Sequence, residues 1–291
     1  MTKLVAIGPA IACLLIAFAP AQEKQETTSN NAIARYVYIQ DTQIGVGKQA
    51  GLANGIAQYR DTVNGVAPDQ YWIAGEPVTS DSEHFTVVSF YDSMASFEKG
   101  GAAFAKVDQA LAAKNPSLAS QAGDIFKGSH RILAEYNKEL SYRPDAVPLA
   151  ETKWWYIIAY ELKPGCEDGF AEIGKAYSEI AKRANWDIHW ITYNVRAGAP
   201  EPTIWVVIPM RSLAEMDPET PAAAREAMAS APMSQMLQQF DKGCTRNVEH
   251  SYIRVDPGLS RPPQSVVAAN PDFWTPKPQP AMAVAKPAKQ K

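Results

Sequence analysis

Residues 153–161 read Lys-Trp-Trp-Tyr-Ile-Ile-Ala-Tyr-Glu, an aromatic and β-branched run typical of a strand. The run lies near the middle of a chain of 291 residues. Residues 35–40, Arg-Tyr-Val-Tyr-Ile-Gln, have the same character and come before any other strand-like segment. We therefore expect each run to be the first strand of its own unit, and this pair of strands decides the fold.

The segments that follow each run have the same order. In both cases a strand is followed by an amphipathic helix, two strands, a second helical region and a last strand. The expected strands are at 35–40, 71–74, 85–91 and 131–142, and then at 154–160, 188–193, 203–208 and 247–255. The chain therefore predicts two successive β-α-β-β-α-β units, over residues 33–145 and 152–257.

A constant spacing between matching residues supports a duplication. Leu52 and Phe170, Tyr59 and Tyr177, and Trp72 and Trp190 are each 118 positions apart. True repeats keep such an offset across several elements, whereas chance matches do not. We interpret the second unit as a copy of the first.

A β-α-β-β-α-β unit forms a four-stranded antiparallel sheet with both helices on one face, the ferredoxin-like arrangement. Its other sheet face needs a cover, which a second unit provides. In this respect the chain resembles the dimeric α/β-barrel superfamily, which includes antibiotic-biosynthesis-monooxygenase-like and NIPSNAP-like proteins, here as a fused tandem. The resemblance is one of pattern and length, without a diagnostic motif. It implies an α+β fold, a pseudo-dimeric barrel and a small-molecule pocket, in a superfamily that holds both enzymes and binders.

Both ends of the chain differ in composition from the two units. Residues 1–21 have a lone lysine, an apolar run and a small-residue cleavage site after Ala21, which predicts a signal peptide and a periplasmic or secreted protein. A membrane anchor is the alternative, but the run is short for one. Residues 258–291 are rich in Pro, Ala and Lys and predict a disordered tail. Residues 271–274, Pro-Asp-Phe-Trp, are either a docking motif or part of that linker.

The charge of the chain limits the class of partner. It has 28 basic and 31 acidic residues, a net charge of −3, and its tail is enriched in lysine. Nucleic-acid binding needs a basic face on the folded part, so we expect no nucleic-acid partner. After removal of the signal peptide we expect no transmembrane anchor. The oligomeric state beyond an intramolecular pseudo-dimer stays open.

Cys166 and Cys244 are the cysteines that remain after processing. Cys166 follows the first strand of the second unit, and Cys244 precedes its last strand. These strands are antiparallel neighbours in a ferredoxin-like sheet, so the two thiols are expected to be close. Export then predicts a disulfide bond. Two free, buried thiols are the alternative.

Strand alternation divides the two first strands into two faces. The more aliphatic face, with Val37, Ile39, Trp155, Ile157 and Ala159, is expected to pack under the helices. The other face is expected to line the barrel interior and, together with Trp190, to form the ligand site: Tyr36, Tyr38, Trp154, Tyr156 and Tyr160. Aromatic rings with hydroxyls suit a flat or amphipathic ligand. A packed aromatic core is the alternative.

Candidate catalytic groups are few. His189, next to Trp190 on an expected strand, is the first candidate for an acid, a base or a haem ligand, and Tyr156 is the second. A structural histidine is the competing interpretation. The four histidines show no metal-ligand spacing, so no metal site is predicted, and no sequence motif indicates a cofactor.

Three functions follow from these observations. The first is an exported barrel that binds a small apolar or aromatic molecule between its two halves. The second is a cofactor-independent or haem-dependent monooxygenase-like oxidoreductase that uses Tyr38, Tyr156, His189 and Trp190. The third is a structural or interaction module that acts through its tail. The sequence leaves open whether the protein is an enzyme.

Overall fold

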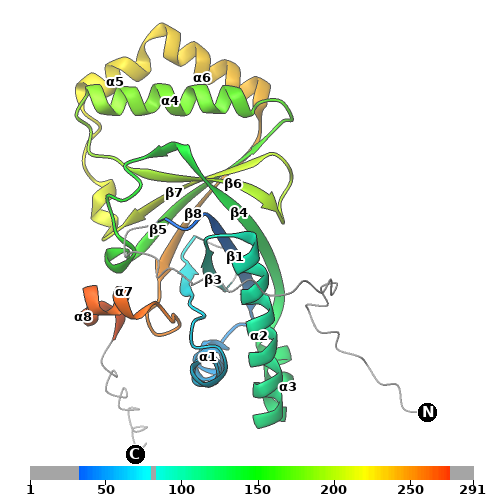
Figure 1. The fold of residues 1–291 in the computed structure, drawn as a ribbon. Coiled ribbons are helices and arrows are strands. Elements are labelled where there is room, and N and C mark those ends of the chain that lie inside the picture. The colour runs from blue at the N-terminus through cyan, green and yellow to red at the C-terminus, as the bar shows by residue number, and fades with distance from the viewer. Residues whose placement is uncertain (1–32, 80–82, 276–291) are drawn as a thin grey trace, which may run out of the picture.

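The computed structural model describes residues 33–79 and 83–275 (Figure 1). The predicted signal peptide and the end of the predicted tail lie outside these residues. The first half of the fold consists of β1 (Tyr36–Ile44), α1 (Gln49–Val66), β2 (Ile73–Pro77), β3 (His84–Tyr91), α2 (Met94–Lys114), α3 (Pro116–Ile125) and β4 (Phe126–Tyr142).

A short linker with the 3-10 turn η1 (Leu149–Glu151) leads into the second half. This half consists of β5 (Trp154–Leu162), α4 (Glu167–Arg183), β6 (Trp190–Ala197), β7 (Thr203–Met210), the 3-10 turn η2 (Leu213–Met216), α5 (Ala222–Ala229), α6 (Ala231–Cys244) and β8 (Thr245–Val255). The helices of the two halves lie on opposite sides of the barrel (Figure 1).

The eight strands form one closed, antiparallel barrel in the order β1-β3-β2-β8-β5-β7-β6-β4. The halves meet where β2 pairs with β8 and where β4 pairs with β6. Closure removes the open sheet edges that otherwise promote aggregation. The predicted α+β class and barrel are confirmed, while the duplication stays a prediction.

The barrel is filled from the inside by aliphatic and aromatic side chains of both halves. Val37 and Ile39 of β1 pack with Tyr193 of β6 and Trp205 of β7 in one buried cluster. Ile157 and Ala159 of β5 pack against the same cluster. The sequence-based assignment of the two strand faces was therefore wrong, because the aliphatic face points into the barrel.

On the aromatic face of β1 and β5, Tyr38 and Tyr160 instead pack under the helices. The ring of Tyr38 lies 5.3 Å from the ring of Phe97 in α2, and that of Tyr160 lies 5.1 Å from Phe170 in α4. Both faces of these strands are covered, so hydrophobicity alone does not distinguish the inner face from the outer one. Choosing the wrong face reverses every side chain of the strand.

Gly198 shapes the join between β4 and β6. Its φ of +94° is in the region that favours glycine. A Cβ atom at this position would lie 1.9 Å from the carbonyl oxygen of Arg131, which is too close for any other residue. The imidazole of His130 also hydrogen-bonds to the Gly198 carbonyl. This close approach holds the hairpin of the second half against the last strand of the first.

Cys166 and Cys244 form a disulfide bond with a Cα–Cα distance of 5.6 Å. The prediction of this bond is confirmed. It links the turn after β5 to the end of α6, which leads into β8, and so closes the second half. A loop of 78 residues predicts a stabilisation of about 4 kcal/mol in the chain-entropy description.

The segment after β8 is ordered, which corrects the prediction of a disordered tail from residue 258. It forms α7 (Gln264–Ala269) and α8 (Pro271–Trp274). Trp274 is buried, and its Nε1 donates to the carbonyl of Ala150 over 2.9 Å. The Pro- and Ala-rich composition hid a few apolar anchors, Leu259, Val266 and Trp274, that dock this segment on the barrel.

The described residues hold neither a membrane-spanning helix nor a metal cluster. No helix in that part of the chain has the length and apolarity needed to cross a membrane. In the same residues, no three His, Cys, Asp or Glu side chains are grouped so as to hold a metal ion.

Candidate functional site

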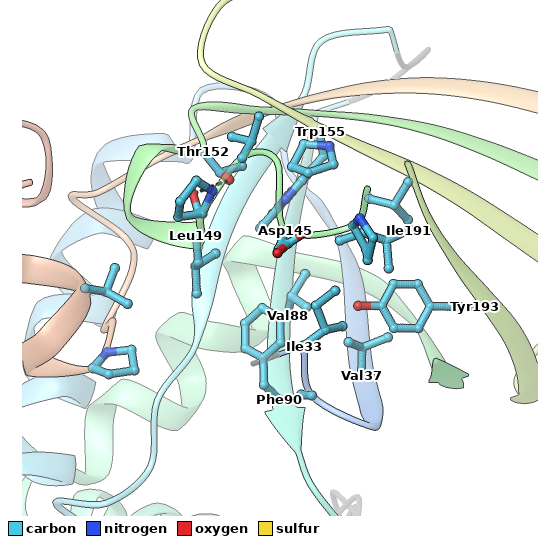
Figure 2. Close-up of a pocket in the computed structure, with 18 of the residues that line it drawn as sticks. Ile33, Val37, Val88, Phe90, Asp145, Leu149, Thr152, Trp155, Ile191 and Tyr193 are labelled. Atoms are coloured by element: carbon cyan, nitrogen blue, oxygen red, sulfur yellow. Dashed lines mark hydrogen bonds between the residues drawn. The ribbon is translucent and has the colours of Figure 1, made fainter. Parts of the chain in front are cut away.

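A cavity of about 190 Å³ lies inside one end of the barrel (Figure 2). Strands of both halves form its wall, and nearly all of their contributing side chains are apolar. The strand residues that line the cavity are Val37 of β1, Val88 and Phe90 of β3, Trp155 and Ile157 of β5, Ile191 and Tyr193 of β6, and Val207 and Pro209 of β7. A small molecule in this cavity would therefore touch both halves.

Besides Ile33 and Ala34, which line the cavity just before β1, two segments outside the strands line its mouth. The first is the linker between the halves, at residues 144–149 with Thr152, and the second is the C-terminal segment at Pro263, Ser265 and Val266. Thr152 Oγ1 donates to the carbonyl of Pro148 over 3.0 Å, which ties the linker to itself. Asn270 and Trp274 both donate to the carbonyl of Ala150, so the two segments are tied to each other.

The floor of the cavity is the next layer of the barrel interior. Ile39 and Trp205 lie two residues beyond Val37 and Val207 on the same strand faces and belong to the buried cluster. Ile132 and Val195 complete this layer. The cavity is thus separated from the other end of the barrel by packed side chains.

Tyr193 places a polar group in this apolar cavity. Figure 2 shows its hydroxyl pointing into the cavity, and the residue is only 6% exposed. Burial raises the pKa of Tyr193, and the neighbouring Tyr136 adds to this rise, so the phenol is neutral at pH 7. No residue in the described part of the chain forms a hydrogen bond with this hydroxyl.

Asp145 is the one charged residue among those that line the cavity in the described structure. It lies in the linker at the mouth, and Figure 2 shows its carboxylate turned toward the cavity. Burial raises the pKa of the nearby Tyr136, and the negative charge of Asp145 adds to this rise. Tyr136 in turn packs on Tyr193, with ring centroids 6.1 Å apart. Asp145 and Tyr193 line the cavity and form its polar edge, while Tyr136 packs beside Tyr193 outside the lining.

The six aromatic residues predicted to bind a ligand do not line this cavity. Tyr38 and Tyr160 pack against helices, as described above. Tyr36 is buried beside Arg35, whose guanidinium lies 5.2 Å from the ring centre. Trp154 is half-buried at the start of β5, on the face opposite to that of Trp155.

The other two predicted ligand-binding residues also lie on the outer face. Trp190 donates from Nε1 to the carbonyl of Leu140, and its ring lies 5.1 Å from that of Tyr142. Tyr156 stacks on Tyr252 with ring centroids 4.5 Å apart, and its hydroxyl lies 2.6 Å from Nδ1 of His250. The structure brings Tyr156 together with a histidine, but on the outside of β5 and β8.

His189 has a structural contact. Its Nε2 lies 2.6 Å from the carbonyl oxygen of Pro209, a residue at the rim of the cavity. The imidazole itself is not part of the lining. His189 and Tyr156, the two catalytic candidates, therefore lie outside the cavity. His189 is connected to the cavity through its contact with the carbonyl of Pro209.

The polar cavity residues that the sequence did not single out are Tyr193 and Asp145. Tyr193 falls on the strand predicted at 188–193, and the alternation with Ile191 places both on one face. The missing information was which face of that strand points inward. Asp145 lies in the linker, where no periodicity indicates direction.

The opposite end of the barrel interior carries polar side chains. Asp41 and Thr86 lie two residues beyond Ile39 and Val88 on the same strand faces. One carboxylate oxygen of Asp41 lies 2.6 Å from Nδ1 of His84, and the other accepts a hydrogen bond of 2.8 Å from Thr86. We call Asp41, His84 and Thr86 the polar end.

A haem group does not fit the cavity. A space of about 190 Å³ is little larger than the ~150 Å³ that accommodates benzene, and a porphyrin has four such rings. In addition, no histidine, cysteine or methionine is among the residues that line the cavity in the described structure. The residues present do not support a haem site here.

Comparison with known proteins gave no match to a family model and no match to a curated protein. Several solved structures have a similar backbone fold. An anthrone oxidase-like protein is 10% identical, with 77% of this chain and 92% of that chain covered and a TM-score of 0.46. A heme-binding protein from Thermus thermophilus is 7% identical, with 77% and 92% covered and a TM-score of 0.43. A mutant chlorite dismutase from Candidatus Nitrospira defluvii is 6% identical, with 82% and 96% covered and a TM-score of 0.47. Identities and TM-scores this low support no inference about function.

Proposed function

We propose that this protein binds one small, largely apolar molecule inside the barrel. The observation that carries the proposal is the cavity itself, which is lined by apolar side chains of both halves and has few polar groups. Small-molecule sites in proteins have this composition: an apolar concave surface with a small number of placed polar groups.

The size of the cavity limits the ligand. A dry cavity of ~150 Å³ holds benzene. A cavity of about 190 Å³ therefore suits a molecule with a single ring and a short substituent, or a short branched chain. Larger polycyclic molecules would require the floor at Trp205 or the mouth at residues 144–149 to move.

The two halves of the barrel are proposed to be copies of one ferredoxin-like unit. The constant spacing of 118 residues supports this, and so does the equivalent strand order, β4-β1-β3-β2 in one half and β8-β5-β7-β6 in the other. On this view the cavity occupies the interface that two separate units would form. A fused pair permits the halves to differ, and only the second half supplies Tyr193.

We also propose that the protein is exported to the periplasm or the medium. The signal-peptide pattern supports this, and so does the disulfide between Cys166 and Cys244, since such bonds persist in oxidising compartments. Mass spectrometry of the protein from its native host tests this proposal. We expect a mature N-terminus at Gln22 and one intact disulfide, and a cytoplasmic protein that starts at Met1 would contradict it.

The two alternative functions have less support. The oxidoreductase hypothesis relied on four residues that do not line the cavity, Tyr38, Tyr156, His189 and Trp190. Of these, Tyr156 contacts His250 and His189 contacts the Pro209 carbonyl. The tail hypothesis concerned residues 258–291, and of these Val266 and Trp274 are buried against the barrel, where they support the fold.

Binding is tested by titrating the purified protein with toluene and following tryptophan fluorescence and calorimetry. Trp155 lines the cavity and is the expected reporter. In the variant Val207→Phe a phenyl ring fills the cavity, and we expect toluene binding to disappear while the protein stays folded. The matched control is Val46→Phe, at a residue 89% exposed on the surface, which we expect to bind as the parent does. Equal binding by parent and Val207→Phe would refute the proposal.

A further inference from the structure

We infer that the ligand carries a hydrogen-bonding head group, preferentially a protonated amine, which is held by the hydroxyl of Tyr193 and the carboxylate of Asp145. This inference rests on the proposed function and names the chemical class of the ligand for that cavity: a small aryl or branched alkyl amine. It follows from the Tyr193 hydroxyl in the cavity, from the negative charge of Asp145 and from the place of both groups in the lining.

Tyr193 supplies the first polar group. Its hydroxyl is within a residue that is 6% exposed, points into the cavity, and has no hydrogen-bond partner among the described residues. The hydroxyl oxygen is accessible from the cavity, since it is not among the fully buried polar atoms without a partner. A ligand that covers it without forming a hydrogen bond would incur the free-energy cost of an unsatisfied polar group, which a hydrogen-bonding ligand would avoid. A purely apolar ligand would leave this hydroxyl unsatisfied, whereas an alcohol or an amine would satisfy it.

Asp145 sets the sign of the charge. It is the only charged group in the described lining, and no lysine, arginine or histidine accompanies it there. A carboxylate accepts hydrogen bonds and attracts cations, and it repels another carboxylate. The cavity therefore favours a cationic head and disfavours an anionic one.

The arginines near the mouth have other partners. Arg143 pairs with Asp187 at 2.5 Å. Arg211 pairs with Glu151 at 2.6 Å and also donates to the carbonyl of Ala146. Within the described residues Asp145 itself takes part in no ion pair. Its charge is thus available to a ligand at the mouth.

Together these groups fix the orientation of the ligand. The ring would lie against Val37, Val88 and Ile157, which form the apolar wall. The head would point to the side where Tyr193 and Asp145 approach the cavity, as Figure 2 shows. A ligand with the head at the opposite end would place a charge against the hydrophobic side chains of the floor, Ile39 and Trp205, away from the Asp145 carboxylate.

The test is a calorimetric titration at pH 7 with four molecules that share one ring and differ in the head: toluene, benzyl alcohol, benzylamine and benzoate. We expect benzylamine to bind most tightly, about fivefold more tightly than benzyl alcohol at low salt, since Asp145 is exposed and its ion pair is partly screened. We expect benzoate to bind most weakly. The preference for benzylamine should shrink at high ionic strength.

Two variants assign the effect to the two groups. Asp145→Asn should make benzylamine and benzyl alcohol bind about equally, with toluene unchanged. Tyr193→Phe removes one oxygen without changing the ring, and should weaken both polar molecules about five- to tenfold, the loss of one hydrogen bond. Asp61→Asn on the exposed face of α1 and Tyr71→Phe are the matched controls, both outside the cavity lining, and should bind all four molecules as the parent does.

The outcomes separate this inference from the proposed function. If all four molecules bind equally, or benzoate binds best, the cavity is a ligand site but the inference about the head group is overturned. If none of the four binds the parent protein, the proposed function fails and the inference fails with it. Circular dichroism of each variant confirms that a loss of binding is not a loss of fold.

Discussion

The two ends of the barrel interior are built on the same strands but differ in packing. At the cavity end, β1 and β3 contribute Val37, Val88 and Phe90, which line the cavity. At the polar end, the same strand faces carry Asp41 and Thr86, and Asp41 holds His84. On β3 the change from an apolar to a hydrogen-bonded site takes two residues, about 7 Å, from Val88 to Thr86, and on β1 it takes four, from Val37 past Ile39 to Asp41.

The two ends are therefore suited to different roles. The polar end satisfies its own groups, since both oxygens of Asp41 have partners. The cavity end leaves the Tyr193 hydroxyl and the Asp145 carboxylate without a hydrogen bond or ion pair in the described residues. We expect changes at the polar end to alter stability alone, and changes at the cavity end to alter binding.

The largest expected effect is at the layer that separates the two ends. Trp205→Ala removes a buried indole from the floor and should lower the free energy of unfolding by about 3–5 kcal/mol. It should also connect the cavity to the polar end, so that a two-ring probe such as naphthalene binds. Urea unfolding and calorimetry measure the two effects. Trp205→Phe, which keeps a ring, is the control, and a variant that loses stability without accepting naphthalene would contradict the assigned role.

The next effect is at the polar end. Asp41→Asn weakens the contacts with His84 and Thr86 and should cost about 1–3 kcal/mol in the free energy of unfolding. Toluene binding, measured under conditions where the variant is folded, should not change. A double-mutant cycle with Thr86→Val isolates the coupling between the two side chains. A clear change in toluene affinity would show that the ends are not independent.

The sequence predicted the order of elements better than the direction of their faces. The pattern of strands and helices, and the pairing of Cys166 with Cys244, depended on local periodicity and on antiparallel neighbours. The inner face of β1 and β5 did not follow from the residues, because Tyr38 and Tyr160 find apolar partners on helices just as Val37 and Ile157 do inside the barrel.

The candidate site was missed for the same physical reason. Once Trp190 was assigned to the ligand site inside the barrel, alternation along the strand turned Tyr193, three residues further on, to the outer face. The end of the chain was missed because composition averages over a segment, whereas docking needs only a few anchors such as Val266 and Trp274. The individual apolar residues of 258–275, rather than its proline content, carry the signal for contact with the barrel.

A smaller effect, of the opposite sign, is expected when the cavity is filled. The phenyl ring of Val207→Phe adds apolar contacts inside the cavity, and should raise the free energy of unfolding by about 0.5–2 kcal/mol. Val195→Phe makes the same enlargement in the packed floor and should instead destabilise the protein by about 1–3 kcal/mol. Thermal unfolding of the two variants compares the stability change in the cavity with that in the filled layer. Destabilisation by both would mean that the cavity does not accept a ring.

The smallest expected effect concerns an ion-pair group on the outer face beside the cavity end. Glu135 of β4 lies 2.9 Å from Arg35 and 2.6 Å from Arg196 of β6. Burial opposes ionisation of Glu135, but its hydrogen bonds and charge pairing with the two arginines lower the pKa of its carboxyl below the usual range. A pKa that is lower in the folded state stabilises the protein above the ordinary glutamate pKa of about 4.3, and this contribution is lost as the pH falls through the lowered value.

Because both arginines are more than half exposed, we expect this contribution to be at most about 1 kcal/mol. Glu135→Gln should therefore lower the urea midpoint slightly at pH 7 and leave it unchanged at a pH where Glu135 of the parent is protonated. Glu139→Gln, on the same strand and without an ion pair in the described residues, is the control. A loss of stability in Glu135→Gln that is equal at neutral and acidic pH would show that the side chain acts through packing instead of charge.

In either case toluene affinity should stay constant. The carboxylate that faces the cavity is that of Asp145, and Glu135 is not among the residues that line it.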